Sequence, residues 1–557
     1  MNAAPPVARP AETALAYHAR TKHSLKAYAA GPETLDWDAQ PNPFREFEGC
    51  PRLALPLAAE DLAVAYDAMV TPGAVPAAPL DLAGVALLLE LSFGLAGWKQ
   101  YGPDRWAVRC NPSSGNLHPT EAYVLASNVA GVPDGVHHYV SRDHVLEQRF
   151  AARTSTSVAF ASASGFVMER SFARAAAGPA RLHLALSSVH WREAWKYGER
   201  AFRYCQLDLG HALAAVRYAA ACLGWSARMV EGVDSSQIAR LGGFDREADF
   251  AGAEREDPDI LIQITPAPAV AVPPPAPGLG GWTGTANVLD RHKLYRWPVI
   301  DAVSAATHGG AGAPDPAPAI APEVPPRAVT NNAAKASAVI LGRRSAQRFE
   351  AKTSAMPQEV FFGMLEALMP GAAAPFDAWG FTPRIHPLLF VHRVEGLAPG
   401  LYALPRREGI TDALKAALRP DFQWVKPEGC PDHLPLYRLV ETDCRGIART
   451  ISCHQAIASD SSFALAMLSE FEATVSADPW RYRQLHWEAG LVGQVLYLEA
   501  EAAGFRGTGI GCFFDDDLHR LVGLEGLEFQ SLYHFTVGRP AIDTRITTEP
   551  AYPGRSA

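Results

Sequence analysis

Two segments of the chain carry the same helical pattern of apolar positions. Apolar residues recur there at intervals of three and four: Leu209, Leu213, Val216, Ala220 and Leu223 in the first segment, and Leu491, Val495, Leu498 and Ala502 in the second. Such spacing places apolar side chains on one face of a helix. A glycine closes each segment, in the position typical of a helix C-terminus. The pattern therefore predicts two long helices, each with a buried face.

The two segments also share their polar positions and their spacing. In order, the shared residues are an arginine, an acid and two glycines: Arg203, Asp208, Gly210 and Gly224 in the first, and Arg483, Glu488, Gly490 and Gly504 in the second. Upstream of each segment, a His-Pro pair leads into an expected strand, a glycine turn and a short aromatic strand. Because this order occurs twice, the sequence predicts a tandem duplication. A fused dimer of this kind can place a site at its interface and let its halves diverge.

Composition changes sharply at two stretches rich in proline, alanine and glycine, residues 265–281 and 308–326. Such stretches form neither a helix nor a central strand. The sequence therefore predicts a first domain, a semi-rigid linker and a second domain, with the boundaries 1–265, 266–329 and 330–557. The short segment 287–300 contains apolar residues, and we expect it to pack on one of the folded halves.

The composition is that of a globular protein, with 48% hydrophobic and 20% charged residues over 557 positions. A net charge of -9 provides no basic surface for nucleic acid. The eight cysteines form no CxxC pair, which favours free thiols in a reducing compartment over disulfides or a zinc site. No HExxH metal motif is present, and we expect His137 and His138 to be polar strand-edge residues.

The most apolar run of the chain is Leu82–Trp98. It is slightly too short to span a membrane and contains Glu90, so we expect a buried helix. The first twenty residues lack an apolar core of signal-peptide length. These features predict a cytoplasmic protein without a membrane segment.

Several motifs, in their order along the chain, resemble the FMN-dependent nitroreductase superfamily. LGRRSAQRF (341–349) resembles the opening of such a subunit, and RCNPSSGNLHPTEAYVL (109–125) resembles the loop that reaches the partner's flavin. WKYGERAFRYCQLDLGHA (195–212) is similar to the branch of azoline dehydrogenases, which oxidise thiazoline and oxazoline rings of ribosomal peptides. The resemblance spans most of both halves. It implies an α+β fold, with a mostly antiparallel sheet flanked by helices in each half and a long central helix at a pseudo-dimer interface.

The resemblance implies FMN as the cofactor. Its phosphate would be held by Arg343, with help from Arg348 or Arg545, through charge-assisted hydrogen bonds, and Ser345 offers a hydroxyl beside it. The family often has an Arg or Lys where this chain has Gln347, so we expect a weaker grip on the phosphate. On its own, the arginine pair is also typical of a solvated helix start.

Small polar residues of the first half would lie against the flavin ring: Pro112, Ser113, Ser114, Gly115 and Asn116. Hydroxyl and amide groups can bond ring carbonyls or ribityl oxygens without steric bulk. From the second half, a glycine loop would bring backbone N–H groups to the reactive edge through Gly509, Ile510 and Gly511. Taken alone, both segments also fit ordinary turn and helix-cap chemistry.

The two contributions occur once each, on opposite halves. The second half has no serine loop and carries WGFTPR at 379–384 instead. The first half has neither an arginine pair nor a glycine loop, and Thr21–Ser24 stands where the pair would be sought. We therefore expect one complete composite FMN site per chain and a second, degenerate one.

Azoline oxidation needs a hydride acceptor and a base for the proton on the adjacent carbon. The Lys-Tyr pair of the azoline branch corresponds to Lys196 and Tyr197, where burial would lower the pKa of the lysine and the tyrosine would relay or orient. The second half has Trp480-Arg481-Tyr482 in the comparable region. The alternative reading is an exposed lysine at a helix start beside a packing tyrosine.

These observations support three functional hypotheses. The first is FMN-dependent oxidation of azolines in a peptide, beside a cyclodehydratase and with dioxygen or another electron acceptor. The second reverses the electron flow, so that NAD(P)H reduces the flavin, which then reduces nitro groups or quinones. The third is a flavin-free scaffold that binds a peptide or a partner protein. The sequence leaves open whether the fused pair dimerises further.

Overall fold

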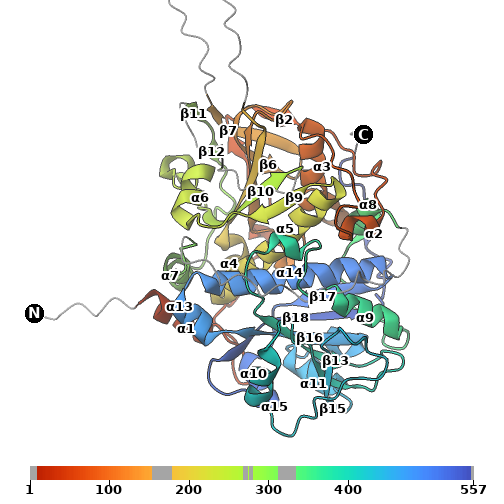
Figure 1. The fold of residues 1–557 in the computed structure, drawn as a ribbon. Helices are drawn as coiled ribbons and strands as arrows, with labels where there is room; N and C mark the ends of the chain where they lie inside the picture. Colours follow the sequence, from red (N-terminus) through yellow and green to blue (C-terminus); the bar gives the residue numbers. More distant parts are fainter. Residues whose placement is uncertain (1–8, 153–177, 267–273, 275–279, 311–333, 554–557) are drawn as a thin grey trace, which may run out of the picture.

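Two long helices, α5 (Ala201–Cys222) and α14 (Arg481–Ala502), form the centre of the molecule. The computed structural model places one half of the chain on each side of this helix pair (Figure 1). Both helices are buried along most of their length, as their apolar pattern predicts. The predicted α+β fold with central helices at a pseudo-dimer interface is confirmed. The structure describes residues 9–152, 178–266, 274, 280–310 and 334–553.

The central helices cross where the repeated glycines face each other. A Cβ atom on Gly210 would lie 2.0 Å from the carbonyl oxygen of Trp487. A Cβ atom on Gly490 would lie 2.1 Å from the carbonyl oxygen of Leu207. Any larger residue would force the two backbones apart, so the repeat retains glycine because its two copies pack backbone against backbone.

The repeated arginines reach across the same interface. Arg203 donates to Asp515 of the second half at 2.9 Å. Arg483 donates to Asp257 and Asp259 of the first half, both at 2.7 Å. The positions shared by the two sequence segments are therefore those that hold the halves together.

Each half contains an antiparallel sheet, and the two sheets share one strand order. The first runs β11-β7-β6-β5-β8-β10-β9, with β2 beside β7, and the second runs β15-β14-β13-β16-β18-β17. The strands of the first are β2 (Arg52–Ala54), β5 (Thr120–Ser127), β6 (Gly135–Val140), β7 (Val145–Ala152), β8 (Arg181–Ser188), β9 (Ser226–Met229), β10 (Asp257–Thr265) and β11 (Gly280–Trp282). Those of the second are β13 (Ile385–Val391), β14 (Gly400–Ala403), β15 (Tyr437–Glu441), β16 (Phe463–Glu470), β17 (Arg506–Ile510) and β18 (Phe529–Gly538). Across the sheets, β7-β6-β5-β8-β10-β9 correspond in order to β15-β14-β13-β16-β18-β17. The topology therefore repeats as the sequence does.

Shorter helices cover these sheets. In the first half and the linker they are α1 (Pro10–Arg20), α2 (Tyr66–Val70), α3 (Leu82–Ser92), α4 (His190–Tyr197), α6 (Ser235–Gly242) and α7 (Pro298–Ala306). In the second half they are α8 (Ala336–Gly342), α9 (Gln358–Glu366), α10 (Ile410–Ala417), α11 (Arg445–Ile451), α12 (Ala456–Asp460), α13 (Glu472–Ala477) and α15 (Asp515–Val522). The described 3₁₀ turns are Trp37–Ala39, Ser114–Asn116, Gly198–Arg200, Glu247–Phe250 and Phe376–Ala378.

Both ends of the chain pack on the opposite half. Near the C-terminus, β19 (Thr547–Glu549) joins the hairpin of β3 (Leu95–Tyr101) and β4 (Asp104–Arg109). Near the N-terminus, α1 packs on α13, and the ring of its His18 lies 4.3 Å from that of Phe471. The exchanged arms leave residues of both halves side by side.

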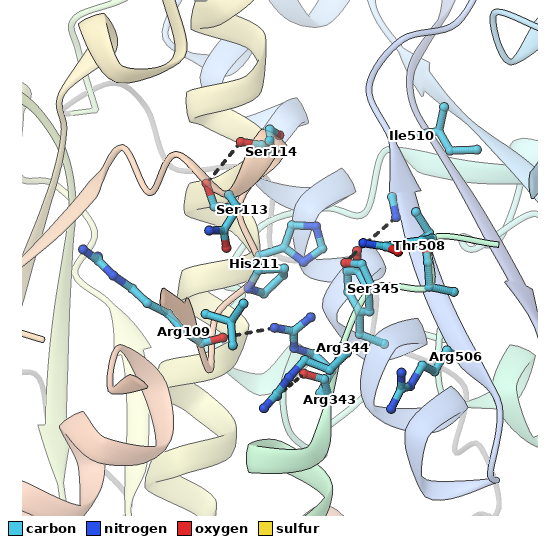
Figure 2. A pocket seen from close by; sticks show the side chains of 18 of the residues that line it. Arg109, Ser113, Ser114, His211, Arg343, Arg344, Ser345, Arg506, Thr508 and Ile510 are labelled. Atoms are coloured by element: carbon cyan, nitrogen blue, oxygen red, sulfur yellow. Dashed lines mark hydrogen bonds between the residues drawn. The ribbon is translucent and has the colours of Figure 1, made fainter. Parts of the chain in front are cut away.

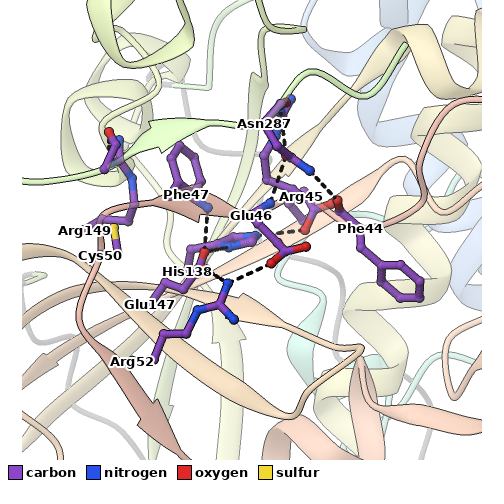
Figure 3. Close-up of polar contacts among 12 residues, drawn as sticks. Phe44, Arg45, Glu46, Phe47, Cys50, Arg52, His138, Glu147, Arg149 and Asn287 are labelled. Atoms are coloured by element: carbon purple, nitrogen blue, oxygen red, sulfur yellow. Dashed lines mark hydrogen bonds and ion pairs between the residues drawn. The ribbon is translucent and has the colours of Figure 1, made fainter. Parts of the chain in front are cut away.

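Part of the predicted linker is folded onto the first half. Strand β11 pairs with β7, β12 (Thr285–Ala286) pairs with β1 (Phe47–Glu48), and α7 packs on α1. Arg45 donates to the carbonyl oxygen of Asn287 at 2.6 Å, and Asn287 donates to that of Phe44 at 3.0 Å (Figure 3). The segment that we expected to pack therefore does so. The proline-rich residues 267–273, 275–279 and 311–333, for which the semi-rigid linker was predicted, lie outside the described residues.

His138 is not the strand-edge residue that the sequence suggested. It lies buried in β6, with a ring nitrogen 3.0 Å from Glu121. Its other ring nitrogen lies 3.2 Å from Glu147 (Figure 3). Burial disfavours its charge, but hydrogen bonds to the two carboxylates outweigh burial and raise the pKa of His138 to about 9. It is therefore the centre of a buried ion triad within a central strand.

The apolar run Leu82–Trp98 is only partly helical, because α3 ends at Ser92 and β3 begins at Leu95. The carboxylate of Glu90 accepts the backbone N–H groups of Ala58 and Ala59 at 2.9 and 3.1 Å. These bonds explain how a carboxylate is tolerated in the buried helix. Among the described residues, no helix has both the length and the apolar character to span a membrane.

Candidate active site

A cavity of about 730 Å³ lies between the two halves, beside the central helices. The first half contributes the loop that follows β4, and the second contributes the segment after α8 together with β17. Figure 2 shows Ser113 and Ser114 on one side of the cavity, with Ser345 and Thr508 on the other. The structure thus brings together, at one place, the two motifs that the sequence has once each.

The serine loop is shaped by its own polar groups. All five predicted residues, Pro112 to Asn116, line the cavity. The backbone N–H and the hydroxyl of Ser114 both donate to Asp208 at 3.0 Å. The hydroxyl of Ser113 accepts the backbone N–H of His118 at 2.8 Å. The hydroxyl groups of both serines therefore hold the loop in place, and the loop lines the cavity.

The arginine segment of the second half contacts the first half directly. Arg343 donates to the carbonyl oxygens of Arg109 and Cys110 at 3.1 and 3.2 Å. The hydroxyls of Ser345 and Tyr497 lie 2.7 Å apart. Gln347, where the family often has a cation, also lines the cavity. The segment is thus fixed between the two halves at the cavity wall.

The predicted glycine loop is the end of an edge strand. Gly509 and Ile510 belong to β17, and Gly511 follows it. All three line the cavity. A Cβ on Gly509 would lie 1.7 Å from the hydroxyl oxygen of Tyr533, and one on Gly511 would lie 1.9 Å from the ring of Tyr204. Glycine is needed at these two positions because aromatic side chains of the cavity wall pack on the strand.

The predicted Lys-Tyr pair is divided between the cavity and its surroundings. Tyr197, at the end of α4, lines the cavity and lies against Gly115 of the serine loop. Lys196 does not line it, and its Nζ atom lies 5.4 Å from the centre of the Tyr197 ring and 5.3 Å from that of Trp37. Burial lowers the pKa of Lys196 and raises that of Tyr197. Lys196 therefore lies outside the cavity lining, next to the ring of Tyr197.

Arg545 and the first-half counterpart of Arg343 differ from the predictions. The side chain of Arg545 is 68% exposed, pairs with Asp543 at 2.7 Å and does not line the cavity. Thr21–Ser24 is not that counterpart, because it follows α1, where the backbone N–H of His23 donates to Asp515 of the second half at 3.0 Å. Those predictions followed motif order, which does not fix where a chain end packs.

The structural counterpart of α8 is α2. The backbone N–H of Tyr66, at the start of α2, donates to Ala334 at 2.9 Å, and that of Ala336, at the start of α8, donates to Val64 at 2.8 Å. Each of these helices is followed by a second helix, α3 or α9, and the residues just before those second helices make matching parallel bridges, Asp81 with Ala130 and Met356 with Val394. The residues after α2, Thr71–Gly73, therefore stand where Arg343 and its neighbours stand after α8, and they carry no cation.

The cavity is rich in cations. Its lining includes the positive side chains Lys99, Arg109, Arg343, Arg344 and Arg506 and the acidic side chains Asp208 and Asp543. Arg344 donates to the carbonyl oxygens of Ala96 and Leu341, both at 2.7 Å. Within the part of the chain that the structure describes, neither Arg343 nor Arg344 forms an ion pair. Such an excess of positive charge favours an anionic ligand.

Sequence reasoning missed several lining residues, and Asp208 is the most informative of them. Burial raises the pKa of Asp208 to about 7, although hydrogen bonds from Ser113 and Ser114 act in the opposite direction. Its position two residues before Gly210 was visible in the repeat. His211 also lines the cavity, and burial lowers its pKa to about 3, so it is a neutral imidazole. Tyr497 and Arg506 carried no comparable signal, and Arg344 was visible only as the second member of the arginine pair.

The donor set fits a flavin mononucleotide. The ring system offers carbonyl and N–H groups and the phosphate offers two negative charges, which match the polar loop and the arginine segment respectively. The buried Oδ1 atom of Asn111 has no hydrogen-bond partner among the described residues and belongs to the cavity lining. An acceptor left in that state indicates a position for a donor from a ligand.

Comparisons with known proteins concern the family and the fold of the chain. Residues 95–253 match the model of the nitroreductase family. A nitroreductase-like protein of Methanocaldococcus jannaschii is 26% identical over 146 residues, which are 26% of this chain and 66% of that protein. A trifolitoxin-processing protein of Rhizobium leguminosarum is 36% identical over 115 residues, 20% of this chain and 29% of that protein. The chain thus spans less than two thirds of either relative.

One solved structure matches almost the whole chain. A nitroreductase-like protein from Anabaena variabilis superposes with a TM-score of 0.65 at 18% identity, over 95% of this chain and 99% of that one. At this identity the likeness concerns the fold, and it includes both halves. Residues 95–253 therefore match the nitroreductase family, within a chain whose fold resembles that of a nitroreductase-like protein along nearly its whole length.

Proposed function

We propose that the protein is an FMN-dependent oxidoreductase with one composite cofactor site per chain. The observation that carries this proposal is the meeting of the serine loop of the first half and the arginine segment of the second across one cavity. The nitroreductase family match supports it. A single site is expected because each motif occurs once, on opposite halves.

The cations at the cavity would hold the phosphate of FMN. Arg343 and Arg344 are the first candidates, since neither is neutralised by a carboxylate in the described part of the chain, and Ser345 adds a hydroxyl. The serine loop and the backbone of Gly509 to Gly511 would bound the ring system. Arg545 would contribute only if its exposed side chain left Asp543.

The finer proposal is the oxidation of azoline rings in a peptide to azoles. Bound FMN would supply the hydride acceptor. Because Lys196 lies outside the cavity lining, Tyr197 would take the proton from the adjacent carbon while its own hydroxyl proton passes to Lys196, whose pKa is lowered by burial. Before that step Tyr197, whose pKa is raised by burial, would be protonated and would orient the substrate as a hydrogen-bond donor. Similarity to a trifolitoxin-processing protein supports a peptide substrate.

This chemistry also suggests partners. An azoline substrate must first be made by a cyclodehydratase, so we propose that such an enzyme acts beside this one. Dioxygen or another acceptor would then reoxidise the flavin. Both are parts of the proposal.

The first test is the flavin content of the purified protein. Heat-released FMN should be found at one equivalent per chain, and an azoline peptide should then be converted to the azole with a mass loss of two hydrogens. Lys196→Ala should abolish most of this conversion, whereas Lys26→Ala, at an exposed lysine, should leave it unchanged. Oxidation of NADPH without azoline conversion would instead select a nitro or quinone reductase. Failure to bind added FMN would select a flavin-free scaffold.

A further inference from the structure

Two cysteines meet at the wall of the cavity. The sulfur of Cys512, which lines the cavity just after β17, lies 2.7 Å from the sulfur of Cys453. Cys453 lies in the turn between α11 and α12 and has a left-handed φ of 51°, which is uncommon for a cysteine. Both are free thiols and both are partly accessible. A disulfide requires about 2.05 Å between the sulfurs, so a small rotation of the two side chains would join them.

The surroundings of Cys512 favour its thiolate. A hydrogen bond from the thiol of Cys453 has the largest effect, and it outweighs burial in lowering the pKa of Cys512. His23 adds to this effect through a second hydrogen bond. Its Nδ1 atom accepts the backbone N–H of Ala29 at 2.8 Å, so in the neutral ring the proton sits on Nε2 and is available for the sulfur. Arg200 contributes a nearby positive charge.

The two sulfurs therefore have different roles. The pKa of Cys453 is raised, chiefly by its hydrogen bond to Cys512 and then by burial. When Cys512 is covalently modified, the main cause of that increase is removed, and Cys453 becomes easier to ionise. This is the arrangement of an attacking thiolate beside a resolving thiol.

We propose that Cys453 and Cys512 form a redox-active thiol pair that reacts with low-molecular-weight disulfides entering the cavity. The Cys512 thiolate attacks one sulfur of the disulfide, which forms a mixed disulfide and releases one thiolate that takes up a proton. Cys453 then loses its proton and attacks the Cys512 sulfur, which forms the Cys453–Cys512 disulfide and releases the second thiol. Two protein thiols are oxidised and one external disulfide is reduced to two thiols, so the exchange is balanced.

Oxidation would change the cavity wall itself. The turn that holds Cys453 also carries Gln455, whose side chain donates to the carbonyl oxygen of Cys512 at 3.2 Å. A covalent link would fix this turn to the residue that follows Gly511. The pair would thus store two electrons at the wall of the proposed active site. Its thiol–disulfide exchange does not require bound flavin.

The test uses the full-length protein and oxidised glutathione. After incubation, free thiols are blocked with iodoacetamide under denaturing conditions and the peptides are identified by mass spectrometry. We expect one cross-link, between Cys453 and Cys512, that dithiothreitol reverses, while the other six cysteines are alkylated. In Cys453→Ser, a glutathione adduct should accumulate on Cys512, at least about tenfold above that on Cys430.

Cys430→Ser is the matched control. Cys430 is also partly buried, and its sulfur donates to the carbonyl oxygens of Pro431 and Leu434 at 3.6 and 3.7 Å. This variant should give the wild-type cross-link. The proposal is overturned if the wild-type protein gives no Cys453–Cys512 peptide, or if Cys512→Ser accumulates an adduct on Cys453 as fast as Cys453→Ser does on Cys512. The wild-type result needs no variant, so a variant that fails to fold cannot hide the outcome.

Discussion

Asp208 and Glu488 hold equivalent positions, two residues before the glycines at which the central helices cross, yet their surroundings differ. Asp208 accepts hydrogen bonds from the Ser114 loop and lines an open cavity. Glu488 pairs with the buried Arg406 at 2.5 Å and accepts the backbone N–H of Arg384 at 2.8 Å. The same carboxylate position thus serves a cavity in one copy and a buried ion pair in the other.

Aromatic side chains fill the space near Glu488. The ring of Trp379 lies 5.3 Å from that of Phe381, which lies 5.8 Å from that of Trp480. A Cβ on Gly380, between the first two, would lie 2.3 Å from the carboxylate of Glu231. The segment that replaces the serine loop is therefore packed among aromatic rings and against Glu231.

The arginines near the two carboxylates also differ in whether an acidic side chain pairs with them. Seven residues after the crossing glycines, Tyr497 lines the cavity, whereas Arg217 holds the equivalent position and makes a two-point pair with Asp377 at 2.7 and 2.8 Å. Near the cavity, Arg343 bonds to carbonyl oxygens and keeps its charge available. Arg343 thus has no carboxylate partner among the described residues, whereas Arg217 is paired within the protein.

The largest effect is expected from Arg406→Ala. Removal of this arginine leaves Glu488 buried without its ionic partner, which typically costs about 3–5 kcal/mol. We expect the free energy of unfolding to fall by that amount in urea denaturation, with the flavin content of the folded fraction unchanged. Arg406→Met combined with Glu488→Gln removes both charges and should recover most of the loss. Equal stability of Arg406→Ala and wild type would show that the pair does not hold this region.

The second prediction uses the pH dependence of stability to distinguish Asp208 from Glu488. Burial raises the pKa of Asp208 from 3.8 to about 7, so the folded state binds more protons than the unfolded state between these values. Stability should therefore fall as the pH rises from about 4 to 7, by on the order of 4 kcal/mol. Asp208→Asn, whose side-chain oxygen can still accept from Ser114, should lose this fall.

The control for this prediction is Glu488→Gln. It deprives Arg406 of its carboxylate, so it should lower stability at both pH 4.5 and pH 7.5. Urea midpoints of the three proteins at the two pH values make the comparison. Parallel pH profiles for wild type and Asp208→Asn would contradict the environment assigned to Asp208.

The third prediction concerns the cofactor. Arg343→Gln removes a charge from the cavity but keeps a side-chain donor for the carbonyl oxygens of Arg109 and Cys110. Loss of one charged hydrogen bond costs about 1.5–3 kcal/mol, so FMN affinity should fall by about 10- to 100-fold. Quenching of flavin fluorescence during titration measures it. Arg545→Gln, at an exposed arginine outside the cavity, is the matched control and should bind as wild type does.

The sequence pattern predicts those elements whose packing contacts occur in both halves. The glycine and arginine intervals of α5 and α14 are visible because the same backbone contact and the same cross-interface ion pairs occur twice. The strand β3 was not separable from the preceding helix, because buried strands and buried helices are equally apolar. The equivalence of α2 and α8 was also hidden, since it consists of backbone pairing between residues that share no side-chain pattern.

The site shows the same limit. The structure places the predicted serine loop, arginine segment, β17 glycines and Tyr197 around one cavity, while Lys196 and Arg545 lie outside its lining. A motif locates a segment, but the direction of each side chain depends on neighbours that come from distant parts of the chain. Asp208 stood in the repeat from the start, and only the fold shows that a loop lies against it in one copy and Arg406 lies against its equivalent in the other.

The smallest effect on flavin is expected from Phe381→Ala. This change removes an aromatic ring from the filled region and creates space near Glu488, with some loss of stability. It supplies no cation, because Thr71–Gly73 holds the place of the Arg343 segment and Arg217 is bound to Asp377. We therefore expect FMN to stay at one equivalent per chain by absorbance after heat release. Two equivalents would mean that aromatic packing alone closes a second site, and that the lost cations are not what separates the two regions.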